Sequence, residues 1–322
     1  MTTARKSAQA SATPQKSECT RLLNYIEKQS ATLARERKFG TSRNYIKARN
    51  SIQAFLKGKD IPLKAMNADL ILEYNDWLTE RGITRNTISF YMRILRSIYN
   101  KAVTQRMVRQ THPFSNVYTG IDKTRKRALD ESGLEKIMTL DLSDSPGLTM
   151  TRDLFVFSFC MRGMSFVDIA FLRKRDINGK RISYLRQKTG RQLTIMMEPC
   201  IENIVKRYLE KTKDSPYVFP IIFSNDPQTA YNQYEAALGR HNRRLKELAS
   251  MANLNIPLSS YCARHSWATA ARNHNVPVSV ITAAMGHSSE STTLIYLDSL
   301  EDSVIDKANH CVLESVNKMV SL

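Results

Sequence analysis

The apolar residues over positions 84–103 recur at the three- and four-residue spacing of an amphipathic helix. Their stripe consists of Ile88, Tyr91, Met92, Leu95, Ile98, Ala102 and Val103. The same spacing appears over 41–57, and two further helical segments lie near 21–29 and over 67–80. Such stripes are most simply the core-facing sides of packed helices. The start of the chain is therefore predicted to fold into a four-helix lobe.

The positive charge of the chain is concentrated in this lobe and in the residues that follow it. The whole chain of 322 residues has a net charge of +18. Residues 1–127 hold 25 Lys and Arg against 9 Asp and Glu, a net charge of +16, which leaves +2 for residues 128–322. This excess is larger than solubility requires, so it indicates a polyanionic partner such as nucleic acid. The predicted phosphate contacts are Arg43, Lys47, Arg93, Arg96, Lys123, Arg125, Lys126 and Arg127.

Length and cysteine pattern limit the class of protein further. A chain of 322 residues suggests about two domains. The five cysteines show no paired spacing of the kind that a zinc site or a disulfide scaffold uses, which fits a reducing compartment and no bound metal. Residues 1–18 lack the apolar segment of a signal peptide, and no later run approaches the length of a membrane span. We therefore expect a cytoplasmic protein that does not associate with membranes.

Composition divides the chain into five predicted segments. We expect a disordered tail over 1–18, a helical DNA-binding domain over 19–108 and a basic linker over 109–127. A second domain follows over 128–299, and an amphipathic tail occupies 300–322. The composition of the linker suits a segment that lies along a DNA backbone.

The second domain is predicted to combine helices with one β-hairpin. Asp130 or Ser132 can cap its first helix, and a second, apolar helix covers 154–160. Two strands over 181–186 and 192–197 flank a Lys-Thr-Gly-Arg turn, in which glycine tolerates a positive φ. Further helices are predicted over 199–211, 228–252, 261–273 and 278–285.

Two short motifs at 261–269 and 285–289 carry most of the chemical signal. The reactive side chains of these motifs and of the elements around them are Arg162, Lys188, Arg264, His287 and Tyr296. Phosphoryl transfer is catalysed mainly by positioning and by stabilisation of charge on the phosphate oxygens. Several cations and one hydroxyl are therefore sufficient for attack on a phosphodiester, and no metal or other cofactor is required.

In this order and on these elements, the residues resemble the catalytic domain of the tyrosine recombinases, also called the phage integrase family. The resemblance covers about 20–310, and the first lobe is similar to the helical core-binding domain of that family. It implies a mostly α fold with a small β-hairpin or sheet, an α+β catalytic domain, and a C-shaped clamp on DNA. It also implies a homotetramer on two DNA duplexes that carry specific recombination sites, in association with the nucleoid. The tail over 300–322 would pack on a neighbouring subunit or on its own domain.

The resemblance assigns a role to each cation of the site. Arg162 and Arg264 match the two arginines that bind the scissile phosphate, where the planar guanidinium donates paired hydrogen bonds and keeps its charge. Lys188 lies in the hairpin turn, where the family places the lysine that protonates the leaving 5′ oxygen. Arg186 and Arg191 are neighbouring alternatives for this acid.

The resemblance also assigns the histidine and the nucleophile. His287 follows a glycine at the end of a helix, and Tyr296 comes nine residues later, at the spacing of the family. A tyrosine with a pKa near 10 is roughly one part in a thousand phenolate at pH 7, so its activation requires about 4 kcal/mol. Nearby arginines and a proton acceptor have to supply this activation. Tyr296 would then form a 3′-phosphotyrosyl link, which conserves the bond energy without ATP.

Two positions depart from the pattern of the family. The usual histidine three residues before the second arginine is replaced by Tyr261, a poor proton acceptor at neutral pH. The usual acidic residue three positions after the first arginine is replaced by Ser165, and the nearest carboxylate is Asp168. We keep Tyr261 among the candidate catalytic residues, and Asp168 as a residue that could orient an arginine. His265 is interpreted as a packing residue.

Two other functions remain open from the sequence. The helices over 261–273 and 278–285 would also suit a helix-turn-helix DNA-binding regulator, although this leaves Arg162, Lys188 and Tyr296 without a role. A type IB topoisomerase shares the chemistry but relaxes supercoils without a specific site. The sequence leaves open the target site, and whether the outcome is integration, excision or inversion.

Overall fold

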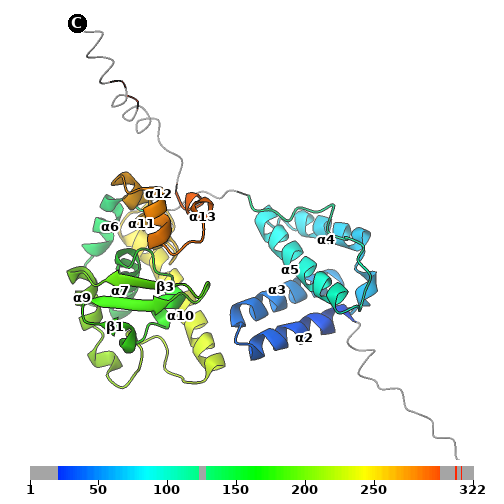
Figure 1. The fold of residues 1–322 in the computed structure, drawn as a ribbon, viewed down its shortest axis with the longest axis horizontal. Helices are drawn as coiled ribbons and strands as arrows, with labels where there is room; N and C mark the ends of the chain where they lie inside the picture. Colours follow the sequence, from blue (N-terminus) through cyan, green and yellow to red (C-terminus); the bar gives the residue numbers. More distant parts are fainter. Residues whose placement is uncertain (1–20, 123–127, 298–308, 310–312, 314–322) are drawn as a thin grey trace, which may run out of the picture. The chain divides into compact units, whose positions relative to one another are not determined.

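The computed structural model describes residues 21–122 and 128–297, together with residues 309 and 313. The chain divides into two compact units, one within residues 1–124 and one within 125–322 (Figure 1). The predicted tail over 1–18 and four of the predicted phosphate contacts, Lys123, Arg125, Lys126 and Arg127, lie outside the described residues. The predicted tail over 300–322 also lies outside them, apart from 309 and 313.

The first unit is a bundle of the four helices that the apolar stripes predict. Its elements are α2 (Leu22–Arg35), α3 (Phe39–Phe55), the 3₁₀ turn η1 (Leu63–Ala65), α4 (Ala68–Glu80) and α5 (Arg85–Thr104). The stripe of α5 is buried, with Met92, Leu95 and Ile98 all fully excluded from solvent. Asn67 caps α4 by accepting a hydrogen bond from the backbone of Leu70 at 3.0 Å.

Two local predictions for this unit were incomplete. The first helix, expected near 21–29, continues to Arg35, because Ser30 and Leu33 are also buried against the rest of the bundle. From the sequence, Thr84 or Asn86 is expected to cap α5; Thr84 is the residue before the helix, but its hydroxyl bonds the side chain of Thr87 and no backbone N–H of the helix.

The second unit surrounds a small antiparallel sheet with helices (Figure 1). Its first helices are α6 (Glu131–Met138), α7 (Pro146–Cys160) and α8 (Phe166–Ala170). The sheet follows η2 (Lys174–Asp176) and has the order β1 (Ile177–Asn178), β2 (Arg181–Leu185) and β3 (Gln192–Met196). The remaining elements are α9 (Pro199–Lys206), η3 (Glu210–Thr212), α10 (Pro227–Met251), α11 (Cys262–Asn273), α12 (Val278–Ala284) and α13 (Glu290–Leu294).

The core of this unit lies where the sheet covers α7. Ile182 on β2 pairs with Ile195 on β3, and both are buried in one cluster with Phe157 of α7. The two-residue strand β1 was not predicted, because two residues are too short to show an alternating pattern. Asp130 caps α6 through the backbone of Gly133 at 2.7 Å, which decides between the two predicted caps.

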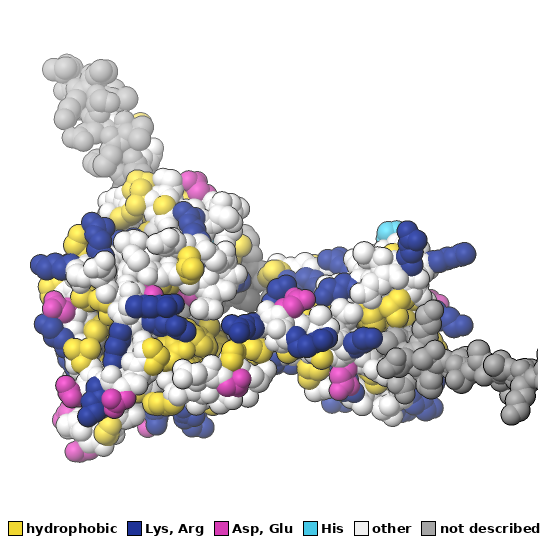
Figure 2. Space-filling model, turned by 60° about the horizontal axis from the view of Figure 1, so that its bottom comes forward, with side chains coloured by type: hydrophobic (Ala, Val, Ile, Leu, Met, Phe, Trp, Pro, Cys, Tyr) yellow, Lys and Arg dark blue, Asp and Glu magenta, His cyan; other side chains and the backbone are white. Residues whose placement is uncertain are grey.

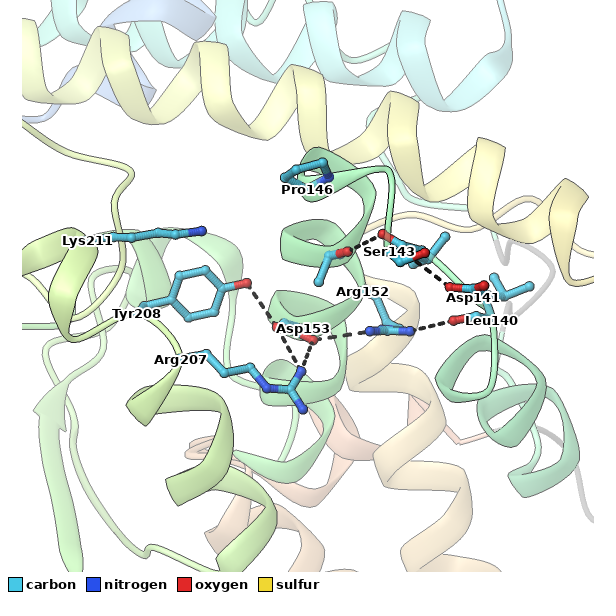
Figure 3. Close-up of a pocket in the computed structure, with 11 residues that line it drawn as sticks. Leu140, Asp141, Ser143, Pro146, Arg152, Asp153, Arg207, Tyr208 and Lys211 are labelled. Carbon is cyan, nitrogen blue, oxygen red and sulfur yellow. Dashed lines mark hydrogen bonds and ion pairs between the residues drawn. The ribbon is translucent and has the colours of Figure 1, made fainter.

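The helix predicted over 199–211 was too long, because α9 ends at Lys206. Past this point the chain turns toward Asp153, a carboxylate of α7 that is only 4% exposed. Arg207 donates to both of its oxygens, at 3.0 and 3.2 Å, and the hydroxyl of Tyr208 donates at 3.0 Å (Figure 3). Burial and the neighbouring Asp153 raise the pKa of Tyr208 above its ordinary value, so this hydroxyl keeps its proton. The cluster ties α7 to the end of α9.

Two other kinds of site are absent from the described residues. They contain no group of three or more His, Cys, Asp or Glu side chains that could hold a metal ion. No described helix is long and apolar enough to cross a membrane. The sulfur atoms of Cys160 and Cys200 lie 3.5 Å apart, a proximity that their spacing in the sequence did not indicate.

Candidate active site

Arg264 is the most buried cation of the candidate site, with 3% of its surface exposed. It lies in the first turn of α11 and donates to the backbone oxygens of Gly163 at 2.7 Å and Met285 at 2.6 Å. Its Nη2 also donates to Nε2 of His287 at 2.8 Å. Desolvation and the neighbouring Arg186 lower the pKa of Arg264, but from so high an ordinary value that the guanidinium stays charged near neutral pH.

Arg162 reaches the site through an unusual backbone turn after α7. Its φ is 55° and that of Gly163 is 72°, both in the left-handed region. A Cβ atom at position 163 would lie 2.6 Å from the Cα of Arg264, so only glycine allows the two arginine segments to approach this closely. The Arg162 side chain is partly exposed and forms no hydrogen bond or ion pair with any described residue.

His287 follows α12 and is 6% exposed. Besides its contact with Arg264, its Nδ1 lies 2.9 Å from the hydroxyl of Thr293. Burial lowers the pKa of His287 to about 4, and the charges of Arg264 and other nearby cations act in the same direction. The imidazole is therefore neutral at physiological pH.

The hairpin turn between β2 and β3 carries three cations with different surroundings. Arg186 is buried and donates to the backbone oxygen of Gly286 at 2.9 Å. Arg191 donates to the backbone oxygen of His287 at 2.6 Å. Lys188 is exposed and forms no hydrogen bond or ion pair with any described residue. The two alternatives to Lys188 thus hold the loop of His287, while Lys188 keeps its donors available.

Tyr296 lies just after α13, where its ring stacks on that of His287 with centroids 4.9 Å apart. Its hydroxyl is hydrogen-bonded to the hydroxyl of Tyr261, at the start of α11. Desolvation and this hydrogen bond raise the pKa of Tyr261 above its ordinary value, so Tyr261 keeps its proton near neutral pH. The ring centroid of His265 lies 5.1 Å from that of Tyr296, and its Nδ1 lies 3.3 Å from the backbone oxygen of Tyr296.

Asp168 lies in α8 and is 4% exposed. One of its oxygens accepts from the hydroxyl of Ser165 at 2.6 Å, and the other accepts from the backbone N–H of Gln187 at 2.8 Å. Burial raises the pKa of Asp168, although Arg186 and Arg264 act against this shift. The carboxylate forms no ion pair with an arginine among the described residues, so it holds the backbone of the hairpin turn, directly before Lys188.

The structure thus brings Arg264, His287, Tyr296 and Tyr261 into direct contact, and it places Arg162 and Lys188 on segments anchored beside them. These segments match known sequences. Residues 127–302, more than half of the chain, match the model of the phage integrase family, and residues 21–117 match that of the phage integrase SAM-like domain. The chain belongs to the phage integrase family.

Two tyrosine recombinases are about a quarter identical to this chain over the residues that align. The tyrosine recombinase XerD of Pseudomonas aeruginosa is 23% identical over 261 residues, which cover 77% of this chain and 84% of the relative. The tyrosine recombinase XerA of Pyrococcus furiosus is 25% identical over 224 residues, covering 68% and 72%.

Solved structures of integrases share the fold. A lambda integrase dimer bound to a core site matches with a TM-score of 0.63 at 14% identity, covering 87% of this chain and 99% of that one. The Tn1549 transposon integrase in complex with circular intermediate DNA matches with a TM-score of 0.61 at 17% identity, covering 88% and 99%. In this integrase-family chain, a mostly helical unit precedes an α+β unit of the catalytic type, as predicted.

The predicted phosphate contacts that the structure describes lie on α3 and α5 of the first unit. Arg43 and Lys47 are exposed one turn apart, and partial desolvation together with the charge of Arg43 lowers the pKa of Lys47. Arg93 and Arg96 line a polar groove of about 600 Å³ on the side of α5. Lysine and arginine are the prevailing charged side chains on the visible face of this unit, at the right of Figure 2.

No pattern in the sequence indicates the roles of Arg186 and Arg191 or of the threonine beside His287. Each of the two arginines bonds a backbone oxygen about a hundred residues away, at separations of 100 and 96. Only their position in the same turn as Lys188 marked them for attention. Thr293 could have been noticed from its place three residues before Tyr296.

Proposed function

We propose that this chain is a site-specific DNA recombinase that cuts and rejoins DNA through a covalent tyrosine intermediate. The family match and the relatives named as tyrosine recombinases support this function. The lambda and Tn1549 integrases that share the fold were both solved on DNA. Its substrate is duplex DNA with specific recombination sites, so it works at the DNA of the cell, in the cytoplasm and at the nucleoid.

The observation that carries the proposal is the unused hydrogen-bonding capacity of Arg264. Four contacts orient its guanidinium: two backbone oxygens, His287, and the ring of Tyr296 at 5.5 Å. Yet Nε of this arginine is buried without a partner among the described residues. A buried donor left unsatisfied costs about 1–3 kcal/mol, which a phosphate oxygen would recover. Because the Tyr296 ring stands over the guanidinium, the ring has to move as the phosphate enters.

The proposed reaction divides into two transesterifications. Tyr296 loses its hydroxyl proton to solvent as its oxygen attacks the scissile phosphorus, the bond to the 5′ oxygen breaks, and the DNA 3′ end becomes a phosphotyrosyl ester. Lys188 gives a proton to the departing 5′ oxygen, while Arg162 and Arg264 stabilise the charge on the phosphate. A 5′ hydroxyl from the partner duplex then gives its proton back to Lys188 and attacks the phosphotyrosyl bond, and the departing Tyr296 oxygen takes a proton from solvent.

Tyr261 and Asp168 have supporting roles in this proposal. A neutral Tyr261 donates a hydrogen bond to the oxygen of Tyr296, which stabilises the developing phenolate but removes no proton from it. Asp168 holds the backbone beside Lys188 and so places the general acid. Neither side chain replaces the proton acceptor that the usual histidine would supply.

Recombination also requires two duplexes in one assembly. We infer a homotetramer, for which the match to a lambda integrase tetramer bound to a Holliday junction, with a TM-score of 0.57, gives support. The second unit has an apolar pocket between α6 and α11 that could receive the amphipathic segment 300–322 of a neighbouring copy. Its apolar lining consists of Leu134, Met138, Phe159, Trp267, Ala270, Ala271 and Val276.

A nicked suicide substrate tests the central claim. The short 5′ fragment diffuses away after cleavage, so the unchanged protein should accumulate a protein–DNA adduct that resists denaturant. Tyr296→Phe should bind the same DNA and give no adduct, while Tyr261→Phe should give a slow but detectable one. The mass of the assembly on two duplexes should correspond to four copies of the chain. Adduct formation by Tyr296→Phe would refute the proposed nucleophile, and relaxation of supercoils without a specific site would favour a topoisomerase.

A further inference from the structure

Two threonine hydroxyls connect the ring of His287 to the backbone of α12. Nδ1 of His287 lies 2.9 Å from the hydroxyl oxygen of Thr293, which is fully buried. The same oxygen of Thr293 lies 2.7 Å from the hydroxyl oxygen of Thr282. That hydroxyl in turn lies 2.7 Å from the backbone oxygen of Val278. Each threonine hydroxyl has one hydrogen to donate, so all the hydrogen bonds in this row must point in the same direction, from donor to acceptor.

The backbone oxygen of Val278, the last acceptor in this row, fixes the direction of every hydrogen bond in it. A carbonyl oxygen only accepts hydrogen bonds, so the hydroxyl of Thr282 gives its hydrogen to Val278. Thr293 must then donate to Thr282, because the hydroxyl of Thr282 has no second hydrogen. The only hydrogen left for the contact between Thr293 and His287 is one on Nδ1 of the imidazole.

The other end of the chain requires the same direction independently. A guanidinium has five N–H donors and no acceptor, so the contact of 2.8 Å between Arg264 and Nε2 of His287 requires a bare Nε2. A neutral imidazole with a bare Nε2 carries its hydrogen on Nδ1. In the opposite direction, Nε2–H would face an arginine donor and the hydroxyl of Thr282 would turn its lone pairs toward Val278. That arrangement loses hydrogen bonds at both ends.

We propose that Thr282 and Thr293 are positioning residues that hold His287 as the neutral tautomer with its hydrogen on Nδ1. The imidazole then presents one acceptor to the site, and this acceptor orients the guanidinium of Arg264. Nη2 is fully occupied by His287 and Met285, which leaves Nε and one hydrogen of Nη1 for a phosphate. The tautomer itself does not depend on the proposed function; only the expected effect on the rate of DNA cleavage rests on it.

The tautomer also depends on where the nucleophile lies. Thr293 is in α13, three residues before Tyr296, and its backbone oxygen accepts from the backbone of Tyr296 at 2.8 Å. The turn that positions Tyr296 therefore also positions Thr293, which determines the tautomer of His287. Displacing this turn would release the ring from its tautomer and Arg264 from its acceptor together.

Nitrogen-15 NMR of the full-length protein labelled at histidine tests the proposal without DNA. The resonances of His287 are assigned by their loss in His287→Gln. We expect a hydrogen on Nδ1 and none on Nε2. Thr282→Val should shift the ring toward a mixture of tautomers, although residue 282 does not touch the histidine, because Thr293 is then free to donate to Nδ1 in competition with the Arg264 donor at Nε2. Thr293→Val should also produce a mixture, and Thr282→Ser and Thr293→Ser should restore the original tautomer.

Thr292→Val is the matched control, because the hydroxyl of Thr292 contacts that of Ser289 at 3.0 Å and not His287. In single-turnover cleavage of the suicide substrate, Thr282→Val and Thr293→Val should be about tenfold slower, the effect of about one hydrogen bond. Thr292→Val should remain within about twofold of the unchanged protein.

The outcomes separate this proposal from the proposed function. A hydrogen on Nε2 in the unchanged protein would overturn the tautomer assignment, whatever the enzyme does. An unchanged tautomer and an unchanged rate in Thr282→Val would remove Thr282 from the chain. A failed adduct assay with the expected tautomer would instead count against the recombinase, and would leave the hydrogen-bond chain in place.

Discussion

Arg162 and Arg264 differ in how much of their hydrogen-bonding capacity the folded chain already uses. Arg264 is buried and oriented by two backbone oxygens and by His287, whereas Arg162 is partly exposed and bonds no described residue. A preoriented donor loses little entropy when it binds a phosphate, while a mobile one has to be ordered by the substrate. Within the proposed site, Arg264 is therefore the fixed anchor and Arg162 the side chain that DNA has to position.

The same contrast among the cations of the hairpin turn leads to a prediction about the general acid. Lys188→Ala should be severely slowed on ordinary DNA, because an alkoxide leaves poorly without a proton. Sulfur at the 5′ bridging position should largely restore the rate, since a thiol with a pKa of about 8.5 leaves readily as its anion. The rates of cleavage of the two substrates by the variant measure this rescue.

Arg186→Ala and Arg191→Ala are the controls for this experiment. Their guanidinium groups bond the backbone oxygens of Gly286 and His287, so their loss should disturb the loop of His287 and should not be rescued by sulfur. If one of these variants is rescued and Lys188→Ala is not, the acid is that neighbour.

At the level of elements, a single glycine allows the end of α7 to lie close to the start of α11. Gly163 has a φ of 72°, and a Cβ there would lie 2.6 Å from Cα and 2.7 Å from Cγ of Arg264. No flexible side-chain end can give way at this contact, because the nearest atom is backbone. The distance between the two arginine segments is thus set by the backbone.

Gly163→Ala should therefore damage the site as well as the fold. Left-handed backbone costs an alanine about 1–2 kcal/mol, and the clash with α11 adds to this cost. We expect a lower free energy of unfolding in denaturant and little or no adduct on the suicide substrate. Gly179→Ala is the matched control, since its φ is 57° and no atom lies within 4 Å of its Cβ position. Gly179→Ala should lose a comparable amount of stability through backbone strain but should retain cleavage. An equal loss of cleavage in both variants would contradict the role of Gly163.

The elements show what local sequence can and cannot predict. The stripe from Ile88 to Ala102 and the glycine of the hairpin turn predicted α5 and the hairpin, because spacing and turn chemistry act over a few residues. The end of α9 was missed because the buried Asp153, some fifty residues earlier, draws Arg207 and Tyr208 out of the helix. Contacts of that range leave no periodicity to read.

At the level of the whole molecule, the asymmetry of charge predicts where salt acts on DNA binding. Residues 1–127 hold a net charge of +16 out of +18. Replacing Arg43, Lys47, Arg93 and Arg96 together by glutamine should reduce the slope of log K against log salt by about 0.9 for each lost phosphate contact, or about 3.6 for all four. Titration of labelled DNA at several salt concentrations measures this slope.

Lys38→Gln is the control in the same unit, because Lys38 is already paired with Glu36 at 2.8 Å. Its slope should stay close to that of the unchanged protein. A fourfold variant with the original slope would show that the charge of the first unit acts elsewhere than on the DNA backbone.

The residues of the candidate site were predicted one by one, but the hydrogen bonds that connect and hold them were not. The order of Arg162, Lys188, Arg264, His287 and Tyr296 was enough to select the residues, through the resemblance to a family. The two arginines that hold the His287 loop and the two threonines behind its ring became visible only in the folded chain. Their partners are backbone oxygens and hydroxyls, which carry no sequence signature.

Asp168 bears on how such proteins are recognised in genomes. Ser165 occupies the place where an acidic residue is usual, yet its hydroxyl passes a hydrogen bond to a carboxylate one helical turn later. A helix brings positions three apart onto the same face, and from there the carboxylate of Asp168 accepts the hydrogen bond of the Gln187 backbone. A motif scan that demands an acid at one fixed position would discard this chain. Sequence searches that accept a serine at this position together with an aspartate three residues later should find further diverged members of the family.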